Sequence, residues 1–527
     1  MGVVLAFGGA GCDPGGMQGN SDSSMELLDA GALVGHLVPQ GSVYAFLAEH
    51  RRRLFPDAMF ADLFPSPRGR PSVPADVVAT VMVLQSLEGL SDRDAVDALV
   101  TDLKWKVACG VSLTDEGFHP TVLTLWRSRL RVSAAPERIF DAVRQVITDT
   151  GVLTNRTRRA LDSTLLDDAV ATQDTVTQLV SVIRRVRAAV PTAAEVKVVA
   201  HDYGSGSKPV CAWDDPVARD VLVSGLVNDA VAILEALGGA DLDDDQARLV
   251  GLLGLVAGQD VEAGDRDGTW QIARRVAKDR VISTVDTETR HMHKSPSSYR
   301  DGYKAHIAVE PDTGIITACD LTPANVGDGP VGVQLLVGEA PGLEVLGDSA
   351  YGSGPVRADL QAARHTAVIK PLPLHHNHRL GDDQFTRDDF IIDYQARTVT
   401  CPEGFTVSID ATGGARFRRR CDGCPARSRC TTAAGGKTFN VTAHDQFLAQ
   451  ARADWRNGIN TDAYRQHRPM VERSIAWLVA NGHRRVRYRG VERNRIALSV
   501  RAATINLRRL INLGLTWNPT GWAIAPP

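Results

Sequence analysis

The sequence lacks the features that place a protein in a membrane or outside the cell. Its 527 residues contain no run of about eighteen or more apolar residues, so no membrane span is predicted. The first residues include a short apolar stretch, but the basic residues that begin a secretory signal peptide are missing. We therefore expect a cytoplasmic protein with reduced cysteines.

The chain also lacks an excess of charge of either sign and is poor in cysteine. Its 59 Lys and Arg residues nearly balance 62 Asp and Glu residues, which gives a net charge of −3. An enzyme that acts on nucleic acid would then need its basic residues clustered. Of the 8 cysteines, four lie within thirty residues of one another, which favours a metal site over disulfides.

A chain of this length is expected to form two to four domains. Residues 1–24 are rich in Gly, Ser and Asp and are predicted to be a disordered extension, with Met25 as a possible start of the folded protein. Residues 25–150 have helical periodicity, shown by Val77, Val81 and their neighbours.

Two consecutive helices in this first domain have the outline of a helix-turn-helix. Ser91 begins a predicted helix over about 92–107, and a short helix follows over 121–130 with Arg127 and Arg129 on it. We expect these arginines to contact DNA, although a plain helical bundle fits the pattern equally well.

From residue 157 the pattern alternates between strands and helices. A strand at 157–166 precedes a long helical segment, 167–280, and a hairpin follows with strands at 303–309 and 315–321. A helix, a strand ending at 348, a helix and a strand at 367–370 complete the series. This is the order of an RNase H-like core if 167–280 is an insertion after the first strand. The acidic run Asp241–Asp245 within it fits the start of a solvated helix better than a metal site.

Three acidic residues lie where such a core would bind metal ions. Asp162 lies on the first strand, Asp348 ends a later strand, and Glu472 follows Pro469, which is predicted to open a helix with Glu472 in its first turn. Phosphodiester chemistry with two Mg²⁺ ions, about 4 Å apart, needs carboxylate ligands of this kind. Each acid alone could equally be a turn residue or a solvated helix residue.

The motifs around these acids resemble those of DDE-type transposases of bacterial insertion sequences, over a stretch from Met25 to about residue 513. The similar motifs are Ala160-Leu-Asp162-Ser-Thr, Leu346-Gly-Asp348-Ser-Ala-Tyr351-Gly and Tyr464…Arg468-x3-Glu472, with His291-Met-His-Lys-Ser295, Tyr303-Lys-Ala-His306 and Thr322-Pro-Ala-Asn325 between them. The resemblance implies catalytic, metal-binding Asp162, Asp348 and Glu472, two Mg²⁺ or Mn²⁺ ions, double-stranded DNA as partner, a homodimer in the DNA complex, and a nucleoid-associated protein.

The chain departs from the tyrosine–arginine–glutamate–lysine signature of one branch of that family. Three residues separate Tyr464 from Arg468 instead of two, and Val479 stands in place of the lysine. Arg484 and Arg485 lie shortly beyond and could replace its phosphate contact. Asp167 and Asp168 are alternative candidates for the first acid, although they lie beyond the predicted strand.

Four cysteines are spaced C-x19-C-x2-C-x5-C and could bind one structural Zn²⁺ ion with tetrahedral geometry. They are Cys401, Cys421, Cys424 and Cys430. The alternative is four reduced cysteines in a small β subdomain.

Nine arginines and one acid, Glu492, lie between residues 484 and 509. An apolar stripe that includes Ile496, Val500 and Leu507 predicts a packed helix in this segment. We expect the arginines outside the stripe to neutralise DNA phosphates, with Arg468 close to the scissile phosphate. The residues assigned to phosphate binding are Arg468, Arg484, Arg485, Arg487, Arg489, Arg127 and Arg129.

The sequence thus predicts an α/β RNase H-like catalytic core with a helical N-terminal domain, a long helical insertion and a small Cys-rich β insertion. The predicted regions are 1–24 (extension), 25–150 (helical, DNA-binding), 151–374 (first part of the core, with insertion 167–280), 375–440 (Cys-rich, zinc), 441–515 (helices that complete the core) and 516–527 (tail). The expected function is DNA cleavage and joining of 3′-hydroxyl ends to target DNA. The alternatives are an inactive or domesticated DNA-binding protein and a metal-dependent nuclease that does not join strands.

Overall fold

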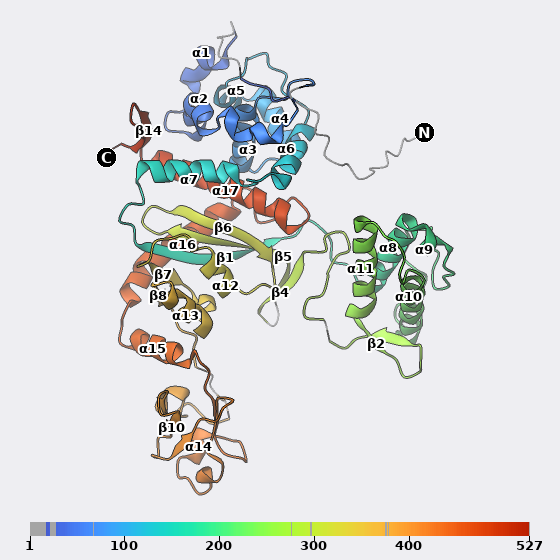
Figure 1. Cartoon of the computed structure of the whole chain (residues 1–527), viewed down its shortest axis with the longest axis vertical. Coiled ribbons are helices and arrows are strands. Elements are labelled where there is room, and N and C mark those ends of the chain that lie inside the picture. Colours follow the sequence, from blue (N-terminus) through green and yellow to red (C-terminus); the bar gives the residue numbers. More distant parts are fainter. Residues whose placement is uncertain are drawn as a thin grey trace.

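The computed structural model describes residues 17–21, 28–66, 68–275, 277–295, 298–374, 377 and 379–525. Most of the predicted extension 1–24, together with Met25, lies outside these residues. Figure 1 shows a central sheet with the N-terminal helices on one side, a helical lobe beside it, and a small lobe at the opposite end of the molecule.

The central sheet has a mixed strand arrangement. Strand β1 lies in the middle, antiparallel to β5 on one side and parallel to β7 on the other. β8 extends the sheet beyond β7 in parallel, while β6 and β4 pair with β5 in antiparallel fashion. The strands predicted along the chain and the β5–β6 hairpin are present, together with β4, which was not predicted. The bounds are β1 (Arg158–Asp167), β4 (Arg290–Ser295), β5 (Ser298–Glu310), β6 (Ile315–Pro323), β7 (Glu344–Gly347) and β8 (Thr366–Ile369).

Helices cover both faces of this sheet because successive residues of a strand point to opposite faces. Ala160 of β1 packs with Val471 of helix α16, and the buried residues of β5 and β6 pack with helix α17. On the other face, Leu161 packs with Tyr351 and with helices α12 and α13. The bounds are α12 (Asp328–Gln334), α13 (Gly354–Ala362), α15 (Asp445–Arg456), α16 (Thr461–Val479) and α17 (Val491–Asn512).

Helix α16 corrects one prediction from the sequence. Pro469 does not open the helix but lies inside it, so Glu472 lies in the middle of α16 instead of its first turn. Proline removes one backbone hydrogen bond from a helix. Here the face that carries Pro469 is exposed, where water can satisfy the freed carbonyl, while His467 and Val471 are buried on the other side.

The N-terminal helices do not form a separate core. Helix α17 contacts α3, α7 and β6, and one apolar cluster runs from the N-terminal helices through α17 to the sheet (Figure 1). The predicted helix 92–107 is two helices, because Asp102 ends α4 and caps α5. The bounds are α1 (Ala30–Val34), η1 (Gly35–Leu37), α2 (Val43–Leu54), η2 (Asp57–Leu63), α3 (Ala75–Glu88), α4 (Asp92–Thr101), α5 (Leu103–Cys109), α6 (Thr121–Val132) and α7 (Arg138–Thr150).

The long insertion after β1 is helical, as expected, and has its own apolar core, which includes Leu179, Leu226 and Leu253. Asp243 caps the start of α11, in agreement with a helix start in the acidic run. The bounds are α8 (Thr175–Ala189), α9 (Pro191–Glu195), α10 (Pro216–Ala236), α11 (Asp244–Gln259), β2 (Val261–Ala263) and β3 (Trp270–Ile272).

A small β-rich lobe lies between β8 and α15, where the sequence predicted the Cys-rich insertion. Its bounds are η4 (Arg387–Asp389), β9 (Ile391–Asp393), β10 (Thr398–Thr400), β11 (Thr406–Ser408), β12 (Gly414–Arg416), η5 (Arg418–Cys421), α14 (Arg427–Cys430) and β13 (Thr438–Asn440). The segment 516–527, predicted to be a tail, contributes to a hairpin of β14 (Leu515–Asn518) and β15 (Gly521–Ile524). No helix among the described residues is long and apolar enough to span a membrane.

Candidate active site

Asp162 lies on β1 with its side chain mostly buried, at 13% exposure. Its Oδ2 atom lies 2.8 Å from Nη2 of Arg468, and its Oδ1 atom accepts a 2.8 Å hydrogen bond from the Ser163 backbone N–H. Burial raises the pKa of Asp162, and the charge of Arg468 opposes that rise. Desolvation makes this carboxylate bind a cation more favourably, and in this structure Arg468 supplies the cation.

Asp348 follows β7, the parallel neighbour of β1. Ala160 pairs with Leu346 in this register, so Asp162 and Asp348 each follow the last pair by two residues. The Oδ1 atom of Asp348 accepts a 2.9 Å hydrogen bond from the Ala350 N–H and caps the short helix η3 (Ser349–Tyr351). The charge of Asp348 also raises the pKa of Asp162, because the two carboxylates are close together.

Glu472 is exposed on α16, one helical turn after Arg468. Burial raises the pKa of the Tyr464 hydroxyl, and the charges of Asp348, Asp162 and Glu472 add to that rise. The charges of all three carboxylates therefore act on one tyrosine. The sequence separations between them are 186 and 124 residues.

The three carboxylates are not arranged as a complete metal site in this structure. Among the described residues, no group of three or more His, Cys, Asp or Glu side chains has an arrangement that could bind a metal ion. One carboxylate oxygen of Asp162 forms an ion pair with the Arg468 guanidinium, and the Glu472 side chain faces solvent. The donors are nevertheless all carboxylate oxygens, which fit Mg²⁺ or Mn²⁺.

The alternative first acids have other contacts at the far end of β1. Asp167 forms a 3.2 Å ion pair with Arg300, and Asp168 is buried and accepts a 3.1 Å hydrogen bond from Thr289.

A fourth carboxylate, Asp328, lies on the other face of β1 and was not singled out in the sequence. It begins α12 and accepts a 2.8 Å hydrogen bond from the hydroxyl of Ser163, the residue after Asp162. Lys304, buried on β5, lies 3.0 Å from the same oxygen. The hydrogen bond to Asp328 thus fixes the position of Ser163, whose backbone N–H donates to Asp162.

His306 lies beside this network, directly across from Ser163 in the β1–β5 register. It is completely buried, and burial lowers its pKa to about 4. Its Nε2 atom is 2.9 Å from the Thr322 hydroxyl, while Nδ1 has no hydrogen-bond partner among the described residues and lies 3.7 Å from Asp328. The imidazole is therefore neutral at ordinary pH.

Three of the four arginines predicted to bind DNA after Glu472 donate to backbone carbonyls of the protein. Arg484 donates to the hydroxyl of Thr164 at 2.7 Å and to the Leu165 carbonyl at 2.9 Å, both on β1. Arg485 donates to the Asp168 carbonyl, and Arg487 to the carbonyls of Gly89 and Leu90. Arg489 is exposed.

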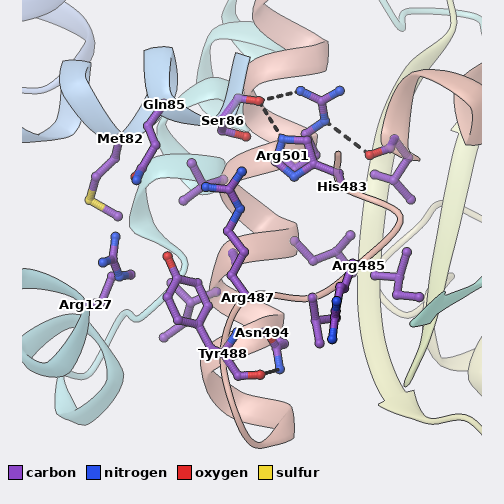
Figure 2. Close-up of a pocket in the computed structure, with 17 residues that line it drawn as sticks. Met82, Gln85, Ser86, Arg127, His483, Arg485, Arg487, Tyr488, Asn494 and Arg501 are labelled. Carbon is purple, nitrogen blue, oxygen red and sulfur yellow. Dashed lines mark hydrogen bonds between the residues drawn. The ribbon is translucent and has the colours of Figure 1, made fainter. Parts of the chain in front are cut away.

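Figure 2 shows the pocket that Arg485 and Arg487 line between α3, α17 and the segment 483–488. Arg501, buried on α17, donates to the carbonyl of Ser86 at 2.5 Å and to that of Trp477 at 2.5 Å. His483 Nε2 donates to the same Ser86 carbonyl at 2.8 Å. Burial lowers the pKa of His483 to about 4.

The two arginines on α6 also have intramolecular partners. Arg127 forms an ion pair with Asp92, and its guanidinium lies over the Tyr488 ring at 4.9 Å from the centroid (Figure 2). Arg129 lies over the ring of Phe64, 4.7 Å from its centroid. These contacts join α6 to neighbouring elements.

The four clustered cysteines line one cavity of the small lobe. Cys421 and Cys430 are buried in its apolar core, and the Lys437 backbone N–H lies 3.4 Å from the Cys421 sulfur. The charges of the other three cysteines raise the pKa of Cys430, although burial is the larger cause. The thiols are thus gathered in one place, although not in a metal-binding arrangement.

Two family models match the chain. The transposase DDE domain matches residues 267–507, a range that includes Asp348 and Glu472, and a transposase domain named DUF772 matches residues 34–129, the N-terminal helices. No curated protein and no solved structure gives a match. The chain therefore belongs to the DDE transposases typical of bacterial insertion sequences.

Proposed function

We propose that the protein is a DNA transposase that binds the terminal inverted repeats of its insertion sequence, cleaves DNA strands and joins the 3′-hydroxyl ends to target DNA. The proposal is supported by the matching positions of Asp162 and Asp348, each two residues after the last pair of the parallel strands β1 and β7, and by the ion pair of Arg468 on α16 with Asp162. The partner is double-stranded DNA, which the protein would bind as a homodimer.

In this proposal the three carboxylates would hold two Mg²⁺ or Mn²⁺ ions, which when bound activate the attacking oxygen and stabilise the leaving one. Arg468 has two roles: it neutralises Asp162 in the free protein and can turn its guanidinium to a DNA phosphate in the complex. Asp328 and Ser163 hold the backbone around Asp162 in place.

The test is strand cleavage on DNA that carries the ends of the element around this gene. Asp162→Ala, Asp348→Ala and Glu472→Ala should each abolish cleavage and leave binding to end DNA largely intact. Asp167→Ala, on the same strand as Asp162, and Asp462→Ala, exposed on the same helix as Glu472, are the matched controls and should cleave normally. Normal cleavage by any of the three Ala variants would remove that residue from the proposed site.

The same assay separates the two alternatives. A protein that binds end DNA and does not cleave it under any divalent metal is a DNA-binding protein without catalysis. A protein that cleaves but yields no joined product is a nuclease.

We propose in addition that Cys401, Cys421, Cys424 and Cys430 bind a structural Zn²⁺ ion. The support is that the four thiols line one cavity, and thiolates are preferred zinc ligands. Zinc analysis of reduced protein should find one ion per chain, which Cys424→Ser should remove, whereas Cys211→Ser in the helical insertion should retain it. Wild-type protein without zinc would refute this site.

A further inference from the structure

The small lobe has more basic than acidic residues in an otherwise slightly acidic chain. Residues 385–441 contain nine Lys and Arg residues and six Asp and Glu residues, whereas the whole chain has a net charge of −3. The lobe alone therefore has a net charge of +3. The ion pairs and hydrogen bonds of the lobe show which basic side chains account for this excess positive charge.

Six of the nine basic side chains are bound within the protein. Arg387 pairs with Asp445, Arg416 with Asp410, Arg427 with Asp422, and Arg429 with Asp383. The other two donate to carbonyls, Arg397 to Asp410 and Lys437 to Cys430. The remaining three are consecutive: Arg418, Arg419 and Arg420, which we call the arginine triplet.

The arginine triplet is exposed and its charges are available. No acid or carbonyl among the described residues forms an ion pair or hydrogen bond with any of the three guanidinium groups, and all three residues are exposed. An unpaired guanidinium is a strong donor for phosphate oxygens and loses little on leaving water. Three in a row form a site for a polyanion.

The backbone presents the arginine triplet rigidly. Arg418 has a φ of 45°, a left-handed conformation that is unfavourable for arginine. Gly436 packs against it so closely that a Cβ atom there would lie 2.6 Å from the Arg418 carbonyl oxygen and 3.1 Å from the Cys421 sulfur. A hydrogen bond of 3.0 Å from Phe417 to the Lys437 carbonyl fixes the other side of this contact. The turn is thus held by the cysteine-containing core of the lobe.

We propose that the arginine triplet is a DNA-backbone contact of this transposase, built on the Cys-rich lobe and separate from the active site. The proposal rests on the proposed transposase function. The lobe lies at the end of the molecule beyond α15, away from the N-terminal helices (Figure 1). Duplex DNA that crosses the active site and reaches this lobe would be bound through its phosphates, without regard to base sequence.

The test is binding of random-sequence duplex DNA as a function of salt. Neutralising the arginine triplet with Arg418→Gln, Arg419→Gln and Arg420→Gln should weaken binding at least about tenfold at low salt. It should also reduce the slope of log affinity against log salt by about 2.7, since each phosphate contact contributes about 0.9. The corresponding triple Lys variant keeps the charges and should bind nearly as the wild type does.

The matched control removes the same charge from arginines that already have acidic partners. Arg144, Arg156 and Arg248 are exposed and pair with Asp141, Asp312 and Asp245. Their triple Gln variant should keep the wild-type slope. The inference is overturned if the Arg418–420 Gln variant keeps both affinity and slope, or if it loses them only together with a lowered melting temperature. If the wild type binds no duplex at all, the proposed function fails as well.

Discussion

Two arginine-rich segments of this protein look alike in sequence and differ in structure. In the segment 484–501, Arg484, Arg485, Arg487 and Arg501 donate to protein carbonyls, whereas none of the arginine triplet at 418–420 has a partner among the described residues. A run of arginines therefore does not by itself indicate a nucleic-acid surface. Such a run binds the protein itself where buried backbone carbonyls nearby have no other hydrogen-bond donor.

Arg501 and Arg487 of the first segment bind carbonyls at the ends of helices. Ser86 is in the last turn of α3, and Trp477 and Leu478 are in the last turn of α16. Arg501 donates hydrogen bonds to all three carbonyls. Arg487 donates to the carbonyl of Gly89, just beyond the end of α3. The last carbonyls of a helix have no partner within it and carry partial negative charge, so a buried arginine is a suitable cap. The triplet has no helix end beside it to cap.

The largest effect expected from this comparison is on stability. Arg501→Met keeps the volume but leaves several buried carbonyls without donors, so the free energy of unfolding should fall by about 3–5 kcal/mol. Chemical denaturation measures this. Arg508→Met, an exposed arginine of the same helix, is the control and should change stability by less than about 0.5 kcal/mol. Equal stability of the two variants would contradict the capping role.

A smaller effect is expected at Arg484, which joins the anchored segment to β1. Arg484→Ala removes bonds to Thr164 and Leu165 and should cost about 1–2 kcal/mol of unfolding free energy. Cleavage should fall more than DNA affinity, because Thr164 lies two residues from Asp162. If the variant instead loses DNA affinity while its stability is unchanged, Arg484 binds DNA and does not mainly stabilise the fold.

The anchored segment should also respond to pH, whereas the arginine triplet should not. Burial lowers the pKa of His483 to about 4 from its ordinary 6.5. The unfolded chain then binds a proton more readily than the folded chain, so the stabilising contribution is complete above pH 6.5 and is lost as the pH falls towards 4. Melting temperature against pH should decline in this window. His306 titrates in the same direction, so His483→Gln should make the decline shallower without abolishing it.

The smallest effect is expected at the free arginines. Arg419→Gln should change the unfolding free energy by less than about 0.5 kcal/mol, because the side chain has no intramolecular bond to lose. Chemical denaturation at low and at high salt would show this. A loss above about 1 kcal/mol would mean that the arginine triplet stabilises the lobe, and the contrast with Arg501 would disappear.

The elements of the core could be predicted because their signals are local. The turn between β5 and β6 and the capping box at Ser91 both act over a few residues. Helix α16 was predicted to begin too late, because Pro469 is a strong local signal for a helix start. Packing of the preceding turns against the sheet overrides that signal, and this packing depends on residues 300 positions away.

The partners of the site residues could not be predicted for the same reason. Asp328 binds Ser163 across 165 residues, and Arg501 binds Ser86 across 415 residues. Composition and spacing mark a residue as charged, but they do not show whether its charge is already neutralised. The positions of Asp162, Asp348 and Glu472 stay a prediction about catalysis until their variants are measured.

Helix α17 has a consequence for the order in which this protein can be completed. It fills the space between α3 and α7 on one side and β6 on the other, and is buried along most of its length. During synthesis the N-terminal helices and the strands emerge first, each with an apolar face that α17 covers. Until residue 512 has left the ribosome, those faces stay open to water and to aggregation. The central sheet is therefore among the last parts of the chain to become stable, long after Asp162 on β1 has been translated.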